Sequence, residues 1–92
     1  MVKWSEDKDR WLRENRGVSF QEISTAVLSG NLIEIMENPA RRGQMAFVIR
    51  LRGYVWVVPF VTEGDTIFLK TAYPSRKMHK RYGGTDEAQE QA

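Results

Sequence analysis

The sequence predicts an α+β domain in which two N-terminal helices pack on a four-stranded antiparallel sheet and a short basic helix follows. Apolar residues recur at helical spacing as far as about Leu28 and at alternating positions after Asn31. The connections between the expected strands are short, which favours an antiparallel meander. A chain of 92 residues supports one hydrophobic core. We therefore expect a single domain over 1–84 and a tail over 85–92.

The first expected element is an amphipathic helix. Trp4, Trp11 and Leu12 fall at positions i, i+7 and i+8, and charged residues fill most of the positions between them. This spacing predicts a helix over about 5–15. The pattern breaks at Gly17, which is the residue type that most often follows the end of a helix.

The second expected element is a helix with two N-terminal signals. Ser19 and Glu22 have the spacing of a capping box, in which each side chain accepts a hydrogen bond from a backbone N–H at the helix start. Val18 and Ile23 stand at the two positions of a hydrophobic staple. These signals predict a helix over 20–28 whose apolar side chains lie in the core.

The pattern then changes to the period of a β-strand. The apolar run GYVWVVPFV has no polar face, so we expect it to be covered on both sides. Pro59 has no N–H to donate, which predicts that it lies at a bulge or on an unpaired side of its strand. The segment TEGD is predicted as a hairpin turn. The four expected strands are 32–37, 44–51, 53–61 and 66–73.

The end of the chain separates its charges. The segment 70–84 contains five Lys or Arg and no Asp or Glu, a formal charge of +5, whereas 85–92 contains three acids and no base, a charge of −3. Pro74 ends the sheet, and Ser75 is a suitable N-cap for a basic helix of about two turns that stops at the two following glycines. The acidic tail has no apolar anchor and is predicted to be disordered. The basic segment predicts an anionic partner, with a solvated helix face as the alternative.

Composition excludes several classes of site. The chain has no Cys, so it has no disulfide, thiolate zinc site or cysteine nucleophile, and one His rules out a multi-His metal site within a single chain. The sequences HExxH, GxxxxGK[ST] and GxGxxG are absent. We expect no metal and no cofactor. The longest apolar run, 54–61, is far shorter than the roughly 20 residues of a membrane-spanning helix. The N-terminus has no export signal, so we expect a cytoplasmic protein that does not contact a membrane.

The remaining chemistry is that of phosphodiesters. RNA cleavage without a metal requires a base for the 2′-hydroxyl proton, a cation for the phosphorane charge and an acid for the leaving 5′-oxygen. Arginine binds two phosphate oxygens at once, lysine can transfer a proton, and tyrosine can stack on a base. DNA has no 2′-hydroxyl, so such residues would cleave RNA or bind nucleic acid. Arg41 and Arg42 lie in an expected loop and are a further candidate contact.

Several segments resemble known toxins. RGVSFQEI, GYVWVVPFV and IFLKTAYPSRK followed by KRY are similar to the BrnT-type toxins of bacterial type II toxin–antitoxin pairs, within the RelE/ParE-like group. The similarity spans about Trp4 to Tyr82. It implies a RelE-like fold and an endoribonuclease that blocks translation, with RNA, free or on the ribosome, as its substrate. It also implies a cognate antitoxin from the same operon, often one with a ribbon-helix-helix DNA-binding domain.

The resemblance and the basic segment together predict a site. Arg76 would neutralise the phosphate, and Lys70 or His79 would transfer the proton. Arg16 stands where better-known family members have the histidine of a KHGV segment. The predicted catalytic residues are Arg76, Lys77, Lys70 and His79. The predicted RNA-binding residues are Lys80, Arg81, Tyr82, Tyr73, Arg16 and Arg50.

Alternatives remain open at this stage. Arg76 could tie the last helix to the sheet or to the antitoxin, Arg16 could satisfy carbonyls at a helix end, and Tyr82 could cap the core. His79 could be an exposed helix residue. The whole protein could be a non-catalytic toxin that inhibits a protein such as gyrase, as ParE-like toxins do, or a plain RNA-binding module.

Overall fold

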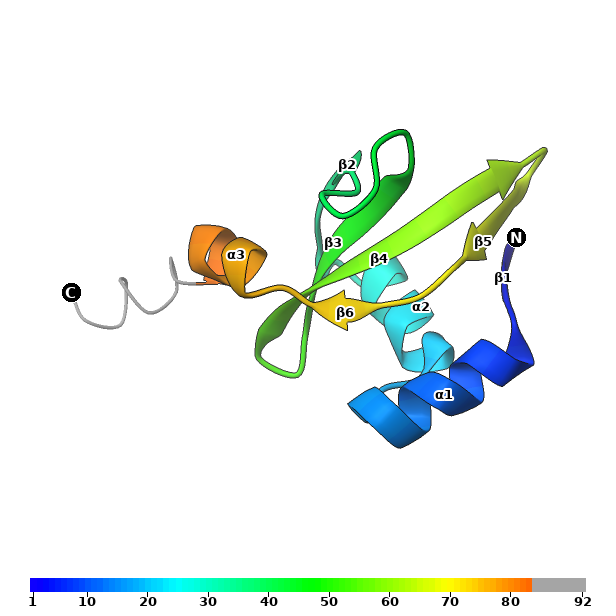
Figure 1. Ribbon diagram of the computed structural model, residues 1–92, viewed down its shortest axis with the longest axis horizontal. Helices are drawn as coiled ribbons and strands as arrows, with labels where there is room; N and C mark the ends of the chain where they lie inside the picture. Colours follow the sequence, from blue (N-terminus) through cyan, green and yellow to red (C-terminus); the bar gives the residue numbers. More distant parts are fainter. Residues whose placement is uncertain (84–92) are drawn as a thin grey trace.

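A computed structural model describes residues 1–83 of the chain (Figure 1). The predicted tail at 85–92 lies outside the described residues. No helix within the described part is long and apolar enough to cross a membrane. The elements in chain order are β1 (Val2–Trp4), α1 (Glu6–Arg16), α2 (Phe20–Leu28), β2 (Leu32–Glu37), β3 (Met45–Leu51), β4 (Tyr54–Glu63), β5 (Thr66–Leu69), β6 (Tyr73–Pro74), α3 (Arg76–Met78) and η1, a π-helical turn (His79–Gly83).

The strands form one mixed sheet around the long strand β4. Its order is β1-β5-β4-β3-β2, and β6 pairs with β4 beyond the end of β5. All pairs are antiparallel except β1 and β5, which are parallel. β5 pairs with β4 from Phe60 to Glu63, whereas β6 pairs with it at Trp56 and Val57. One edge of β4 therefore borders two short strands.

The α+β class and the packing of helices on a sheet are confirmed, but the expectation of four antiparallel strands is wrong. β1 adds a parallel edge strand, and the segment 66–73 divides into β5 and β6. Trp4, which we expected to continue the helical stripe, lies on β1 and stacks on Phe20 at 5.7 Å between ring centroids. The spacing between Trp4 and Trp11 fits a helix, but Trp4 reaches the same core from a strand.

Both N-terminal helices begin after a serine N-cap, and the cap at Ser19 is the predicted one. The Ser5 hydroxyl accepts a hydrogen bond from the Lys8 N–H at 3.3 Å, and the Ser19 hydroxyl accepts one from the Glu22 N–H at 3.1 Å. α1 ends at Gly17, whose φ of 69° lies in the left-handed region that favours glycine. The predicted bounds of α2 agree with the structure.

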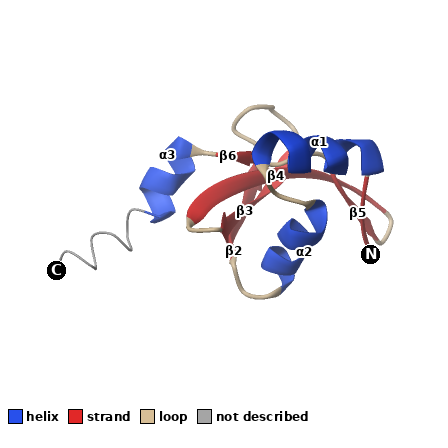
Figure 2. Ribbon diagram, turned by 90° about the horizontal axis from the view of Figure 1, so that it is seen from below, coloured by secondary structure: helices blue, strands red, loops and turns tan. Residues whose placement is uncertain are grey.

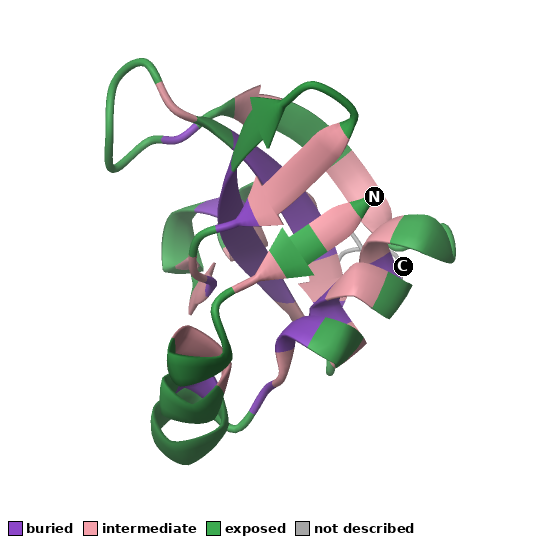
Figure 3. Cartoon of the chain, turned by 90° about the vertical axis from the view of Figure 1, so that its right-hand side faces the viewer, coloured by how far each residue is buried: buried purple, intermediate pink, exposed green. Residues whose placement is uncertain are grey.

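The main core lies between these two helices and one face of the sheet. Leu12, Phe20 and Ile23 are fully buried. They pack on side chains from the middle strands, which Figure 3 shows as buried while the outer surfaces of the helices are exposed. Figure 2 views the molecule from the side that α1 and α2 cover. The strand residues of this cluster are Phe47, Ile49, Leu51, Trp56, Val58, Phe60 and Leu69.

The opposite face of the sheet is covered at one end. Val48, Val55 and Val57 pack there against Met78 of α3, together with Tyr73 and partly buried neighbours. β4 is thus buried on both sides, as its apolar run predicts. α3 is shorter than expected and continues into the wide turn η1. The Ser75 hydroxyl caps it by accepting a hydrogen bond from the Met78 N–H at 3.1 Å.

Pro59 lies within β4 at the position where its neighbour strand is interrupted. It is opposite Ala46 of β3, and its carbonyl accepts a hydrogen bond from the Lys70 N–H at 2.9 Å on the other side. The N and C=O of one residue in an antiparallel strand point to the same side. The missing N–H of Pro59 therefore faces the gap between β5 and β6, which agrees with the expected unpaired side.

Candidate nucleic-acid interface

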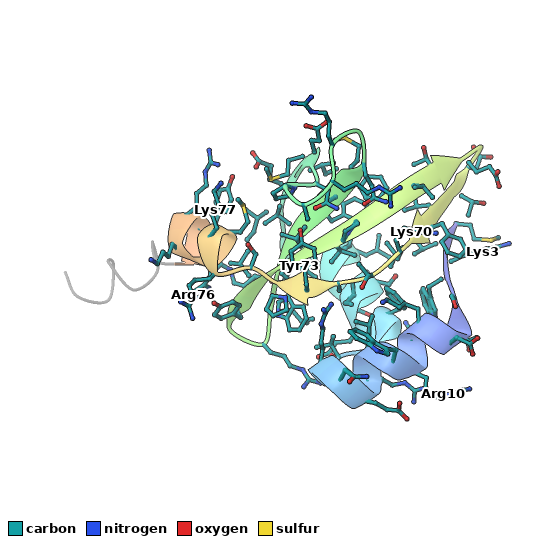
Figure 4. The ribbon with its side chains drawn as sticks, in the orientation of Figure 1. Lys3, Arg10, Lys70, Tyr73, Arg76 and Lys77 are labelled. Carbon is teal, nitrogen blue, oxygen red and sulfur yellow. The ribbon has the colours of Figure 1, made fainter. Side chains whose placement is uncertain are left out.

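The four predicted catalytic residues do not form one cluster. Lys70 follows β5, while Arg76 and Lys77 lie on α3, beyond β6 (Figure 4). Arg76 and Lys77 also project to opposite sides of this short helix. All three side chains are exposed. Lys70 and the α3 cations therefore do not line one common site in this fold.

His79 lies with α3 and packs against its neighbours. Its ring stacks on Tyr54 with 4.0 Å between centroids and 11° between planes. A Cβ added at Gly83 would overlap the imidazole, so the chain at Gly83 closes directly over this ring. The imidazole is half-buried in this position. The geometry gives His79 a packing role at the end of β4, and its predicted part in proton transfer stays a prediction.

Arg16 connects two parts of the fold. Its Nη1 donates a hydrogen bond to the carbonyl of Ala72, in the link between β5 and β6. Its guanidinium also lies 4.7 Å from the centre of the Trp11 ring. Arg16 therefore holds the C-terminal end of α1 against the segment that follows Lys70. The alternative in which Arg16 satisfies a carbonyl is met in part, because the carbonyl belongs to Ala72 and not to the end of α1.

Tyr82 is tied to the edge strand β2. Its hydroxyl donates a hydrogen bond to the Glu34 carboxylate at 2.7 Å. This bond, with some burial, raises the pKa of Tyr82. The Arg81 guanidinium lies 5.6 Å from the centre of the same ring. Lys80 is exposed nearby, and Arg50 is half-buried on β3 opposite Val55. Of these predicted RNA-binding residues, Arg50 belongs to the sheet, and Lys80, Arg81 and Tyr82 belong to η1.

Tyr73 organises the loop between β2 and β3. Its hydroxyl donates a hydrogen bond to Oδ1 of Asn38 at 2.8 Å, and burial raises the pKa of Tyr73. Asn38 is 5% exposed; it donates from Nδ2 to Oε1 of Gln44 at 2.9 Å, and its Oδ1 also accepts from the Ala40 N–H at 3.0 Å. Both ends of the loop are therefore fixed to each other and to β6.

The fixed loop presents Arg41 and Arg42 beside Lys70. Together with β4 residues they line an open groove of about 580 Å³. Among the described residues that form this groove, three carry positive charge and none is a carboxylate. The lining residues are Arg41, Arg42, Gly43, Gln44, Met45, Phe60, Val61, Thr62 and Lys70. We call this the cationic groove. Such a surface attracts a phosphate group.

The sequence pointed to the cationic groove in part. Lys70 is a predicted site residue, whereas Arg41 and Arg42 are predicted only as residues of a loop that contacts RNA or nothing. The paired arginines of NPARRG are the local signal, but their position beside Lys70 depends on the Tyr73–Asn38 hydrogen bond. Those two residues are 35 positions apart in the chain.

Within residues 1–83, no group of three or more His, Asp or Glu side chains could bind a metal ion together. Neither the protein-family models nor the curated protein sequences with which the chain was compared match it.

Replacing Tyr73 by Phe should destabilise the protein by about 1 kcal/mol, because the Asn38 amide loses a buried hydrogen-bond partner while the ring stays in place. Urea unfolding measures the change. Tyr82→Phe is the matched control, since it removes a hydroxyl that binds the exposed Glu34, and it should have the smaller effect. Equal or larger destabilisation by Tyr82→Phe would contradict this role for Tyr73.

The same hydroxyl predicts a pH dependence. Because burial raises the pKa of Tyr73 in the folded state, the unfolded chain loses this proton at lower pH, near the usual value of about 10. The associated stability is complete below about pH 10 and is lost as pH rises through the folded-state pKa. Tyr73→Phe should therefore reduce the alkaline loss of stability.

Proposed function

We propose that this protein is the toxin of a type II toxin–antitoxin pair and cleaves RNA without a metal ion. The observation that carries the proposal is the cationic groove, where Arg41, Arg42 and Lys70 converge and the described lining has no carboxylate. A phosphodiester backbone fits this charge. The resemblance of IFLKTAYPSRK to BrnT-type toxins supports the toxin class.

The groove residues suggest how cleavage would proceed. The RNA 2′-oxygen would form a bond to phosphorus while the bond from phosphorus to the 5′-oxygen breaks. Arg41 and Arg42 would neutralise the charge of the phosphorane, since a guanidinium binds two phosphate oxygens at once. Lys70 would donate the proton that the 5′-oxygen takes up. The described lining has no imidazole or carboxylate, so the 2′-hydroxyl proton would pass to water.

One observation favours a second candidate function. Lys70 and the cations of α3 lie apart from each other, with β6 between them (Figure 4). A protein that binds RNA in the groove and does not cleave it needs no further catalytic group. Such a protein would still block translation if the bound RNA were a messenger. In both cases Arg76, Lys77 and Lys80 on the α3 side are available to an acidic surface of the antitoxin.

Expression of the protein alone should arrest growth, and co-expression of a small adjacent gene should restore it. The variant with Arg41, Arg42 and Lys70 replaced by alanine should be harmless at the same soluble level, because its groove has lost the three cations. Arg10→Ala should remain toxic, since Arg10 lies on α1 away from the groove (Figure 4). Normal growth with abundant soluble wild-type protein would contradict the toxin proposal.

A further inference from the structure

A second hollow adjoins the cationic groove on the other side of Lys70. Its volume is about 230 Å³, and it shares Val61, Thr62 and Lys70 with the groove. Its remaining lining residues are Glu63, Thr66 and Phe68. The Lys70 ammonium lies 5.1 Å from the centre of the Phe68 ring. The two hollows therefore form one continuous surface with Lys70 at the boundary.

This surface lies on the sheet face opposite α1 and α2. Directly paired residues project from the same face of a sheet, and Phe68 pairs with Lys3 on one side and Val61 on the other. The neighbours of Phe68, Ile67 and Leu69, pack on the main core instead. α3 covers this face at the far end of β4 (Figure 1). The Phe68 ring is half-buried in this arrangement.

The two hollows differ in charge. The cationic groove has three cations and no carboxylate among its described lining residues, whereas the second hollow has one cation, Lys70, and one carboxylate, Glu63. Glu63 offsets the charge of Lys70 in the second hollow, so a phosphate is attracted more strongly to the groove. A neutral base would find in the second hollow an aromatic ring and the apolar side chain of Val61. Glu63 could also accept a hydrogen bond from a base.

We propose that the second hollow binds one unpaired base of a single-stranded RNA, stacked on Phe68, while the adjoining phosphates lie in the cationic groove. This inference rests on the proposed function and specifies its substrate as single-stranded. A base within a duplex is stacked between its neighbours and cannot turn onto a protein ring, whereas single-stranded bases commonly stack on aromatic side chains. For the base to stack, the Lys70 ammonium would move off the Phe68 ring, and it would then lie between the base and its phosphate and contact both.

The test measures binding of two fluorescent ten-nucleotide RNA strands to the full chain by anisotropy. One strand carries all its bases, and the other has abasic sites throughout, so it offers phosphates alone. Phe68→Leu should weaken binding of the complete strand by at least about fivefold, because base stacking on an aromatic ring is lost, and should leave binding of the abasic strand unchanged. Phe68→Tyr keeps a ring and should restore binding. Arg42→Ala should weaken binding of both strands.

The outcomes separate this inference from the proposed function. If the wild-type protein binds neither strand, the proposed function fails. If it binds RNA and Phe68→Leu binds the complete strand equally well, or loses affinity equally for both strands, the base-binding hollow alone is refuted. Should Phe68→Leu not fold, the wild-type protein can be titrated into a strand containing 2-aminopurine. Stacking should quench its fluorescence, and unchanged fluorescence on binding would overturn the inference.

Discussion

Replacing Arg41, Arg42 and Lys70 together by alanine is expected to weaken binding of single-stranded RNA about 100-fold at about 0.1 M salt. Each cation that neutralises a phosphate adds about 0.7 to the slope of log affinity against log salt concentration, so three contacts give a slope of about 2. Because about 0.1 M is one log unit below about 1 M, these contacts contribute about 2 log units of affinity at this concentration. The slope of log affinity against log salt concentration should be about 2 smaller for this variant than for the wild type. All three side chains are exposed, so the stability of the variant should change little.

A second triple variant provides the matched control. Arg76, Lys77 and Lys80 are also exposed, and replacing them by alanine removes the same net charge from the α3 side. This variant should bind RNA nearly as well as the wild type. If the α3 variant loses more affinity than the groove variant, the phosphates bind at α3, as the charge run of the sequence first indicated, and the assignment to the groove is wrong.

Phe20→Ala should destabilise the protein by about 3–5 kcal/mol, because it empties the space of a fully buried aromatic ring. Phe20 joins three elements: it belongs to α2, stacks on Trp4 of β1 and donates a hydrogen bond from its N–H to the Asp9 carboxylate of α1 at 2.8 Å. That backbone bond survives the substitution, but the ring contact with β1 does not. For a domain of this size the midpoint of thermal unfolding should fall by at least about 12 °C.

Leu28→Ala is the control for Phe20→Ala. Leu28 is on the same helix and is 77% exposed, so its loss should change stability by no more than about 0.5 kcal/mol. A small effect of Phe20→Ala, comparable with that of Leu28→Ala, would show that β1 and the two helices do not form one cooperative unit with the sheet.

The elements that the sequence predicts correctly are those set by neighbouring residues. The cap at Ser19 and the two-sided burial of β4 depend on spacings of a few positions, and both are found in the structure. β1 could not be predicted in this way, because its three residues carry almost no periodic pattern. Its first residue, Val2, pairs with Ile67, so the pairing is a long-range contact that local propensity does not encode.

The candidate site likewise combines features that neighbouring residues determine with features that only long-range contacts determine. The charge run from Lys70 to Arg81 suggests one cluster, but the extended link through Tyr73 and Pro74 carries the chain to the far end of β4 and separates Lys70 from α3. The cations that do lie near Lys70 come from a loop some 30 positions earlier, held by the Tyr73–Asn38 hydrogen bond. Only the fold brings Arg41 and Arg42 to this surface.

Incubation of purified full-length protein with total RNA in excess EDTA tests the central claim most directly. We expect the wild type and the α3 triple variant to cleave the RNA, and the variant lacking Arg41, Arg42 and Lys70 to leave it intact even at saturating protein, because cations at the phosphate stabilise the transition state as well as the complex. Intact RNA in the presence of wild-type protein that demonstrably binds it would contradict cleavage and leave RNA binding alone.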